Sequence, residues 1–222
     1  LPPPVFILPQ NIPQHCCDAF SFFNFQIIKS KGLFVAPHLS FKCEPWIAIR
    51  NIRHLVAAHH APSFFSLSPH LELPAKIYLS RKDTRKIINE TELFAFLDQH
   101  GFTRIFPEDL SVRDQLSMFR YADQIVAIHG AGMAPILWGD AARSLKIIEL
   151  FPPSYMTNVW RVIAEQKNWP WVGVRGKLWP AICKHIYANT RPRKYSQKNF
   201  EVCMDSFASA FDSLELSQAC AC

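Results

Sequence analysis

The ten residues Gln124–Met133 (QIVAIHGAGM) constrain the fold of this 222-residue chain more than any other segment. Residues Ile125–Ile128 form a short, continuous apolar run, which is typical of a strand buried on both faces of a parallel sheet. The small residues His129–Gly132 (HGAG) allow the backbone to turn sharply and to approach a ligand closely. Met133–Trp138 then has the pattern of a helix. Such a helix start offers free N–H groups to a phosphate, although plain α/β architecture gives the same pattern.

Strands and helices alternate regularly from Lys76 onward. The expected strands are Lys76–Ser80, Phe102–Phe106, Ile125–Ile128, Leu145–Leu150 and Trp171–Val174. The expected helices are Asn89–His100, Ser111–Ala122, Gly132–Trp138, Thr157–Lys167 and Asp205–Leu216. This alternation predicts an α/β fold, with a Rossmann-like parallel sheet that carries helices on both faces.

The flanking segments give weaker patterns. We interpret residues 1–32 as irregular, apart from a short strand near Phe22–Ile28. A strand at Leu33–Ala36 and a helix from Pro45 to His60 follow. A Pro- and Ser-rich linker at 62–74 then marks a domain boundary. We therefore divide the chain into an N-terminal segment with its linker (1–70), a Rossmann-like domain (71–180), and a C-terminal extension that contains the last helix (181–222).

The composition indicates a globular protein, because 49% of the residues are hydrophobic and 19% are charged. The net charge is +6 and the isoelectric point is near 9.0. The basic residues are dispersed, so we expect no nucleic acid as a partner and favour a small diphosphate-bearing ligand. The seven cysteines are odd in number and lack zinc-site spacing, which favours reduced thiols in a cytosolic protein. No apolar stretch reaches the roughly 18 residues that span a bilayer.

Polar and glycine residues follow three of the expected strands at the same edge of the sheet, where ligands of such folds bind. The first strand ends in Ser80 and Arg81, and Arg85 follows four residues later. Guanidinium groups bind phosphate oxygens in pairs, and a hydroxyl adds a further bond. The third strand ends in His129–Gly132. The fourth ends near Glu149, whose carboxylate we expect to accept the hydroxyls of a ribose.

Each of these features also has a purely structural interpretation. Arg81 and Arg85 fit a solvated basic loop. His129 fits a core histidine that is bonded to a backbone carbonyl. Glu149 fits an ion pair with Lys146. The convergence of all of them at one edge of the sheet is what favours a ligand site.

Five segments resemble glycosyltransferase family 61 in their order and spacing. They are Lys76–Arg85 (KIYLSRKDTR), Asn89-Glu90, Asp109–Gln115 (DLSVRDQ), Ile128–Met133 (IHGAGM) and Ile147–Leu150 (IIEL). The resemblance covers about residues 70–175. That family includes bacterial capsular-polysaccharide enzymes, plant xylosyl- and arabinosyltransferases, and animal N-acetylglucosaminyltransferases. The resemblance implies a GT-B-type fold, of which this Rossmann-like domain is the donor-binding half, and inversion at the anomeric carbon.

The chain differs from the family pattern in two places. The family usually continues HGAG with Leu, a small residue and Asn, where this chain has Met133, Ala134 and Pro135. Residues 1–70 are also too few for a complete acceptor-side domain, so the chain is either a fragment or has a reduced domain. The sequence opens with Leu1 rather than Met, so we expect the natural N-terminus, with any targeting segment, to lie outside it.

The resemblance implies an enzyme that moves a sugar from a nucleoside diphosphate, expected to be UDP, to a glycan or other hydroxyl acceptor in capsular or surface polysaccharide synthesis. The donor-binding residues would be Ser80, Arg81, Arg85, Gly130, Ala131, Gly132 and Glu149. His129 is the candidate catalytic base, and His59 or His60 are weaker candidates. We expect no metal and no other cofactor, because no Asp-x-Asp pair is present.

Two other function classes remain. A non-catalytic sugar-nucleotide-binding module fits the short N-terminal segment. A lipase-like hydrolase also has an HGAG-type loop, but it requires a GxSxG motif that this sequence lacks. For the enzyme we expect a bacterial cytoplasmic location with peripheral membrane association, or the Golgi lumen in a eukaryote. The sequence gives no expectation for the donor sugar, the acceptor linkage or the oligomeric state.

Overall fold

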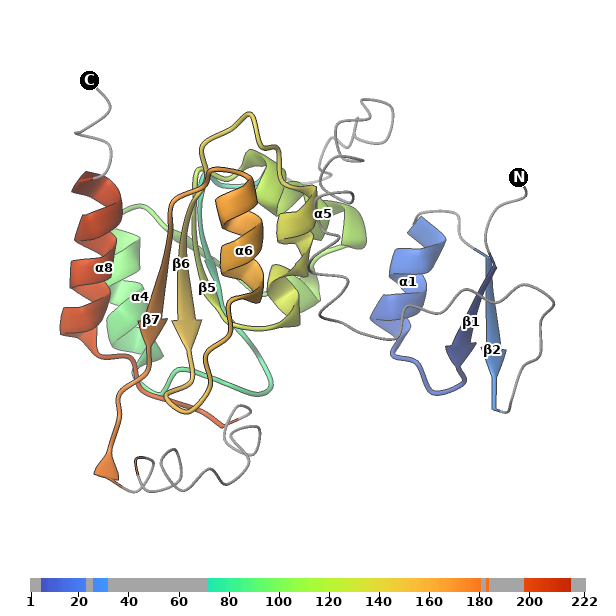
Figure 1. Ribbon diagram of the computed structural model, residues 1–222, viewed down its shortest axis with the longest axis horizontal. Helices are drawn as coiled ribbons and strands as arrows, with labels where there is room; N and C mark the ends of the chain where they lie inside the picture. The colour runs from blue at the N-terminus through green and yellow to red at the C-terminus, as the bar shows by residue number, and fades with distance from the viewer. Residues whose placement is uncertain (1–4, 23–25, 32–71, 181–182, 184–197, 217–222) are drawn as a thin grey trace.

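The computed structural model describes residues 5–22, 26–31, 72–180, 183 and 198–216 (Figure 1). The largest element of this part of the chain is a five-stranded sheet, parallel throughout, in the order β4-β3-β5-β6-β7. Its strands are β3 (Lys76–Leu79), β4 (Thr103–Ile105), β5 (Gln124–Ile128), β6 (Lys146–Phe151) and β7 (Trp171–Arg175). The alternating sequence pattern predicted all five, with ends that differ by at most one residue.

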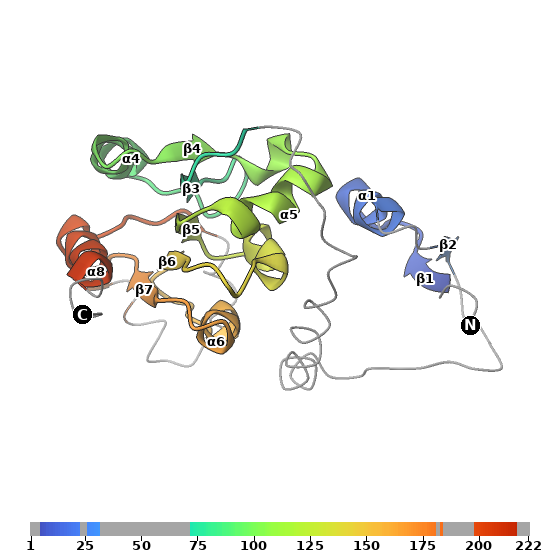
Figure 2. The ribbon, with the colours of Figure 1, turned by 90° about the horizontal axis from the view of Figure 1, so that it is seen from above.

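Helices cover both faces of this sheet, as the view from above shows (Figure 2). One face carries α4 (Glu90–Gln99) and α8 (Met204–Leu216), and the other carries α5 (Val112–Tyr121), the 3₁₀ helix η3 (Ala131–Trp138) and α6 (Val159–Gln166). A short 3₁₀ turn, η2 (Pro107–Asp109), joins β4 to α5. All six residues of β6 are buried, as expected for a strand with helices on both sides. The predicted α/β class is confirmed.

The helix after the glycine turn is of the 3₁₀ type. The Met133 N–H donates to the Gly130 carbonyl at 3.1 Å, and the Gly139 N–H donates to the Ile136 carbonyl at 3.2 Å. Both bonds join residues three apart. Pro135 has no N–H to donate and its ring crowds the preceding turn, which disfavours α-helical hydrogen bonding here.

The first thirty residues are more regular than predicted. They contain β1 (Val5–Pro9), α1 (Gln14–Phe22) and β2 (Gln26–Ser30), and the two strands pair in parallel. The prediction of an irregular segment is therefore wrong for these residues. The pattern was weak because each strand has only five residues and β1 ends in Pro9. Helix α1 lies beside α5, where the Arg113 guanidinium is 5.8 Å from the centre of the Phe22 ring.

Several sequence predictions concern residues outside the described ranges. These are the strand at Leu33–Ala36, the helix from Pro45 to His60, most of the linker, and the base candidates His59 and His60. The domain division near residue 70 accordingly stays a prediction. At the other end of the chain, the expected last helix is present as α8. The segment before α8 forms two isolated bridges, Ile87 with Phe200 and Gly176 with Val202.

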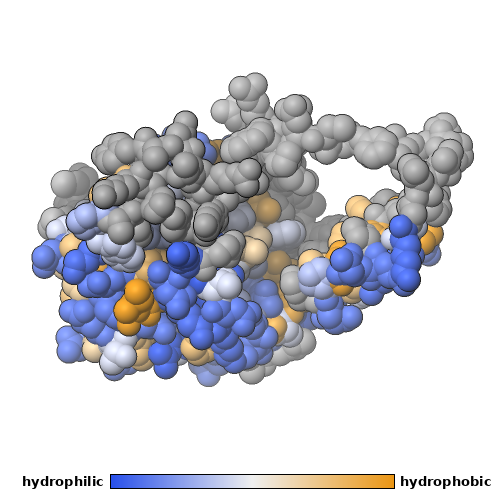
Figure 3. Space-filling model, turned by 90° about the horizontal axis from the view of Figure 1, so that it is seen from below, coloured by the Kyte–Doolittle hydropathy of each residue, from blue (hydrophilic) through white to orange (hydrophobic). Residues whose placement is uncertain are grey.

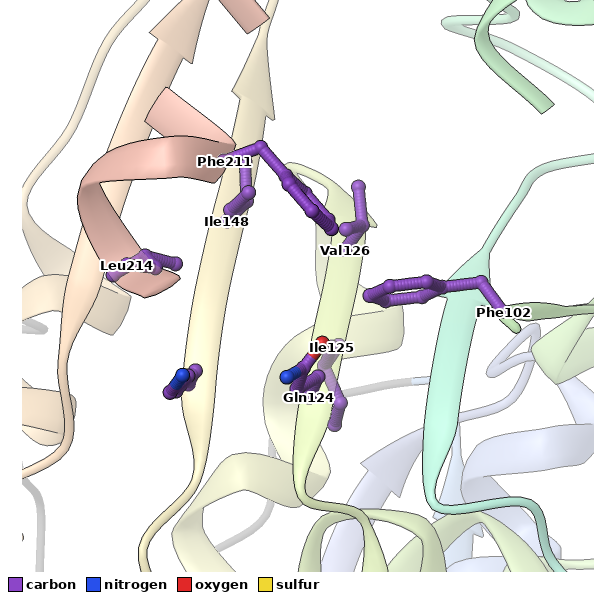
Figure 4. A pocket seen from close by; sticks show the side chains of 8 residues that line it. Phe102, Gln124, Ile125, Val126, Ile148, Phe211 and Leu214 are labelled. Atoms are coloured by element: carbon purple, nitrogen blue, oxygen red, sulfur yellow. The ribbon is translucent and has the colours of Figure 1, made fainter. Parts of the chain in front are cut away.

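A small cavity lies between α8 and the sheet (Figure 4). Phe102, Val126, Ile148 and Phe211 contribute apolar walls, and Gln124 places the cavity at the amino ends of the strands. Its volume of about 10 Å³ is room for about one water molecule. A nucleotide cannot bind there.

In the described part of the chain, no helix has the length and apolar character needed to cross a membrane.

A buried lysine joins the end of η3 to the end of α6. Lys167 is 2% exposed, and its Nζ donates to the carbonyls of Leu137, at 3.2 Å, and of Gly139. The ammonium also lies 4.9 Å from the centre of the Trp169 ring. Burial lowers the pKa of Lys167 to about 8, and nearby Asp140 opposes this shift. The side chain supplies a donor to carbonyls that the end of a helix leaves unpaired.

We expect the free energy of unfolding to rise with pH between about 8 and 10.4, because the unfolded Lys167 then binds a proton that the folded one has lost. Lys167→Met should flatten this rise and destabilise the protein by about 1–3 kcal/mol, since two carbonyls lose their donor. Denaturant titrations of both proteins across this pH range measure the effect. Equal slopes against pH in the two proteins would contradict the assignment.

Candidate functional site

The chain reverses its direction across the sheet between β3 and β5. It runs from β3 outward to β4, and then crosses back to β5 on the other side of β3. In open α/β sheets this reversal leaves a crevice beyond the carboxyl ends of the two strands, and ligands bind there. The loop after β3 carries Ser80, Arg81 and Arg85, and the loop after β5 is His129–Gly132. Figure 3 views the molecule from below, the side toward which the strand arrows of Figure 1 point, and its described residues there are mainly hydrophilic.

Arg81 and Arg85 converge on a single main-chain oxygen. Nη1 of Arg85 donates to the His129 carbonyl at 2.6 Å, and Nη1 of Arg81 donates to the same oxygen at 3.4 Å. Within the described structure, Nε of Arg85 is buried without a hydrogen-bond partner. Burial and the neighbouring Arg81 charge both lower the pKa of Arg85. Two guanidinium groups that share one neutral acceptor favour the binding of an anion.

The backbone conformation of Arg85 is unusual for a residue with a side chain. Its φ is +62°, in the left-handed region, which is more common at functional sites than elsewhere. The next residues are tied to the C-terminal segment: Ile88 N–H donates to the Phe200 carbonyl at 2.8 Å. Asn89 forms two hydrogen bonds of 2.9 Å with the backbone of Val202. The loop after β3 that carries Ser80, Arg81 and Arg85 (the arginine loop) therefore leads into residues that are bonded to positions more than a hundred residues later in the sequence.

Gly130 provides the space that both arginines occupy. A Cβ atom on this residue would lie 2.2 Å from Nη1 of Arg81 and 3.2 Å from Nη1 of Arg85. At Gly132, a Cβ atom would lie 3.3 Å from the ring of Pro107. The glycines of the HGAG segment thus permit a close approach, as the sequence predicted, and at Gly130 the approaching groups are the guanidinium ends of Arg81 and Arg85.

The His129 side chain belongs to a buried polar chain. Its Nδ1 lies 2.5 Å from Oε1 of Glu149, and Nε1 of Trp171 donates to Oε2 of the same carboxylate at 3.0 Å. The imidazole also stacks on Phe151, with ring centres 5.0 Å apart. Glu149 has no exposed surface, and its burial raises its pKa while the bond with His129 opposes that shift. Direct contact with a ribose is not available to Glu149 in this conformation.

Ser80 is buried at the end of β3 and bonded within the protein. Its hydroxyl donates to Glu90, which also accepts from the Tyr78 hydroxyl at 3.0 Å. Burial, followed by the nearby Glu90 carboxylate, raises the pKa of Tyr78. These bonds join the end of β3 to the first residue of α4. Sequence reasoning included Glu90 only through the Asn89-Glu90 segment of the family resemblance.

A cavity of about 690 Å³ opens beside the two loops. This volume lies within the range of roughly 300–1,000 Å³ found for ligand pockets. Ser80, Arg81 and Gly132 line one side, and Gln115 of α5 and Asp18 of α1 also contribute. The sequence indicated Gln115 only through the Asp109–Gln115 segment of the family resemblance, and it gave no indication of Asp18. His129 and Gly130 do not line the cavity. They lie in the turn after β5, between the lining residues Ile128 and Ala131.

The described residues include no group of three or more His, Cys, Asp or Glu side chains arranged to hold a metal ion.

A family model described as Glycosyltransferase 61 matches residues 3–148, which is more than half of the chain. The match spans α1, the arginine loop and the HGAG segment, and therefore most of the cavity wall. A comparison with curated proteins gives no match.

Proposed function

The chain belongs to glycosyltransferase family 61, and from this premise we propose that it transfers a sugar from UDP to an acceptor hydroxyl with inversion at the anomeric carbon. Membership itself implies a glycosyltransferase that uses a nucleotide-sugar donor and a glycan acceptor. Beyond what membership implies, we propose that the nucleotide is uridine diphosphate and that the sugar is transferred with inversion. We also propose a GT-B-type arrangement with a second Rossmann-like domain. We propose no metal cofactor.

The observation that carries the proposal is the convergence of Arg81 and Arg85 on the His129 carbonyl at the reversal point of the sheet. A diphosphate that enters the crevice can replace this neutral acceptor with charged oxygens, which form stronger bonds with guanidinium groups. The buried Nε of Arg85 would then gain a partner. Ala131 and Gly132 line the cavity beside Arg81, where backbone N–H groups can supply further donors.

The proposed reaction is a single displacement. The acceptor oxygen forms a bond to the anomeric carbon while the bond from that carbon to the β-phosphate oxygen breaks, and UDP leaves with the electron pair. Negative charge develops on the departing diphosphate, and fixed cations at this position stabilise the transition state more than the ground state. Arg81 and Arg85 supply this charge.

We propose His129 as the group that takes the proton of the acceptor hydroxyl. With Nδ1 bonded to Glu149, the lone pair of a neutral imidazole lies on Nε2. The side chain of His129 is 10% exposed and does not line the cavity in this conformation, so the acceptor hydroxyl would have to reach the small exposed part of the residue. The buried carboxylate of Glu149 would stabilise the imidazolium that forms.

For the acceptor we propose a capsular or other surface polysaccharide, and for the location a bacterial cytoplasm next to the membrane. The support is the sequence HGAGMAP, in which Met133, Ala134 and Pro135 resemble the capsule-type branch of the family. The reduced cysteines are consistent with that compartment: Cys16, Cys17, Cys183 and Cys203 are all free in the described residues.

The second candidate function is a sugar-nucleotide-binding module without catalysis, which the absence of His129 from the residues that line the cavity favours. A thermal-shift panel of UDP-, GDP- and CMP-sugars identifies the donor, because a ligand that binds the native state raises its melting temperature. Incubation of the best donor with glycan acceptors, followed by mass spectrometry, then separates the two functions. Released UDP with a glycosylated acceptor supports the enzyme, and binding without turnover supports the module.

We expect Gly130→Ala to weaken UDP binding by about 10- to 100-fold, because the new methyl group displaces charge-assisted donors. Gly132→Ala is the matched comparison, since its methyl group meets only the Pro107 ring and should have a smaller effect. Isothermal titration with UDP measures both. Equal affinities for Gly130→Ala and the wild type would show that the arginine positions seen here are not those that bind the donor.

A further inference from the structure

Three polar side chains from neighbouring strands form a hydrogen-bonded row that ends beyond the carboxyl end of β5. Trp171 begins β7, Glu149 lies within β6, and His129 follows β5. Their hydrogen bonds run from Trp171 Nε1 to Glu149 at 3.0 Å and between Glu149 and His129 Nδ1 at 2.5 Å. We propose that Glu149 and Trp171 are positioning residues for the donor-binding arginines and act on them through His129.

The link between this row and the arginines is the His129 main chain. The carbonyl oxygen of His129 accepts from both Arg81 and Arg85. The N–H of the same residue donates to the Leu150 carbonyl at 2.8 Å, and its ring is fixed by Glu149. Both the backbone and the side chain of His129 are thus anchored on β6. The direction of the carbonyl, and with it the resting position of both guanidinium groups, follows from these anchors.

The presence of a carboxylate at this position needs an explanation. Glu149 is completely buried in a strand whose neighbours, Ile147, Ile148 and Leu150, are aliphatic. A buried carboxylate is costly unless it is paired and hydrogen-bonded, and an aliphatic residue would be the ordinary choice for stability. Both carboxylate oxygens have partners here. The partners connect it to the crevice, so a role in placing the donor site accounts for a residue that stability alone does not favour.

This inference rests on the proposed function, because its readout is the affinity for UDP. We expect Glu149→Gln to weaken UDP binding on the order of ten-fold and Trp171→Phe to weaken it a few-fold. Glu149→Gln should also lower kcat, because the carboxylate stabilises the His129 imidazolium, so the affinity for UDP is the readout of the positioning role. The glutamine keeps the size of the side chain but cannot accept from both partners. The phenylalanine keeps an aromatic ring and removes only the indole donor. Nitrogen-15 spectra of the His129 imidazole report whether its tautomer changes.

Trp169→Phe is the matched control. Trp169 is 4% exposed, and its Nε1 donates to the Arg143 carbonyl at 2.7 Å, away from the crevice. This variant also removes one indole donor, so it should lower the melting temperature as Trp171→Phe does. Its affinity for UDP should equal that of the wild type.

The results of these experiments distinguish the positioning role of Glu149 and Trp171 from the existence of the donor site. If the wild type binds UDP and both Glu149→Gln and Trp171→Phe bind it equally well, the positioning role is overturned and the donor site stands. If the wild type binds no nucleotide, or Arg81→Ala binds UDP as the wild type does, the proposed donor site itself is overturned. Should Glu149→Gln fail to fold, Trp171→Phe against Trp169→Phe decides the question alone.

Discussion

Replacing Arg81 with alanine is expected to lower kcat/KM for sugar transfer by about 10²- to 10³-fold. Arg81 lines the cavity and points at the turn after β5, so its charge lies where the diphosphate is proposed to bind. Removing one such donor should also weaken UDP binding by about 10- to 100-fold. Arg85→Ala should act in the same direction, because its guanidinium shares the His129 carbonyl with Arg81. Steady-state kinetics and isothermal titration with UDP measure both effects.

Arg143→Ala provides the control for a general loss of positive charge. Arg143 is bonded to Asp123 at 2.9 Å and to the Tyr121 carbonyl at 3.2 Å, next to the amino end of β5. Its side chain is 43% exposed, so the substitution should cost little stability. Transfer rates for Arg143→Ala should match the wild type. A similar loss in Arg81→Ala and Arg143→Ala would mean that overall charge, and not the arginine loop, attracts the donor.

The second large effect is expected at His129. His129→Gln should reduce kcat at saturating donor by about 10²- to 10⁴-fold, because the acceptor hydroxyl loses the group that takes its proton. The UDP affinity should fall only as far as it does in Glu149→Gln, since glutamine leaves the His129 backbone in place. Rapid-quench measurements at saturating UDP-sugar separate the chemical step from binding. Unchanged kcat with weakened donor binding would restrict His129 to positioning and place the base elsewhere.

Much of the central domain follows from the sequence because its signals are local. The apolar run before the glycine turn predicts β5, and Gly101, with φ of +79°, follows the helix expected at Asn89–His100. Ser111, the first residue of the next expected helix, accepts a hydrogen bond from the Asp114 N–H at 3.2 Å and caps α5. Arg81 and Arg85 were placed at the crevice by the rule that parallel strands bring their carboxyl ends to one edge.

The partners of Glu149 were not predictable in the same way. The sequence predicts this carboxylate near the carboxyl end of its strand, in contact with a ribose, whereas it lies buried within β6. Its actual neighbours, His129 and Trp171, come from two other strands, and no local pattern fixes which side chains of adjacent strands meet. Asp18 reaches the cavity wall from a helix that the sequence pattern did not reveal. Long-range pairing, and not propensity, decides these contacts.

The C-terminal segment also contributes to the site from outside the region that the family model matches. That match ends at residue 148, whereas Phe200 and Val202 hold the residues that follow Arg85. The bridge between Ile87 and Phe200 extends this attachment. The loop that carries Arg81 and Arg85 is therefore attached to the segment before α8 through Phe200 and Val202.

The most direct test of the diphosphate site is a crystal structure of the protein with UDP. The account predicts phosphate oxygens within hydrogen-bond distance of both Arg81 and Arg85, next to the backbone N–H groups of Ala131 and Gly132. The uridine diphosphate should occupy the cavity beside the turn after β5. A diphosphate bound elsewhere, with both arginines still on the His129 carbonyl, would contradict it.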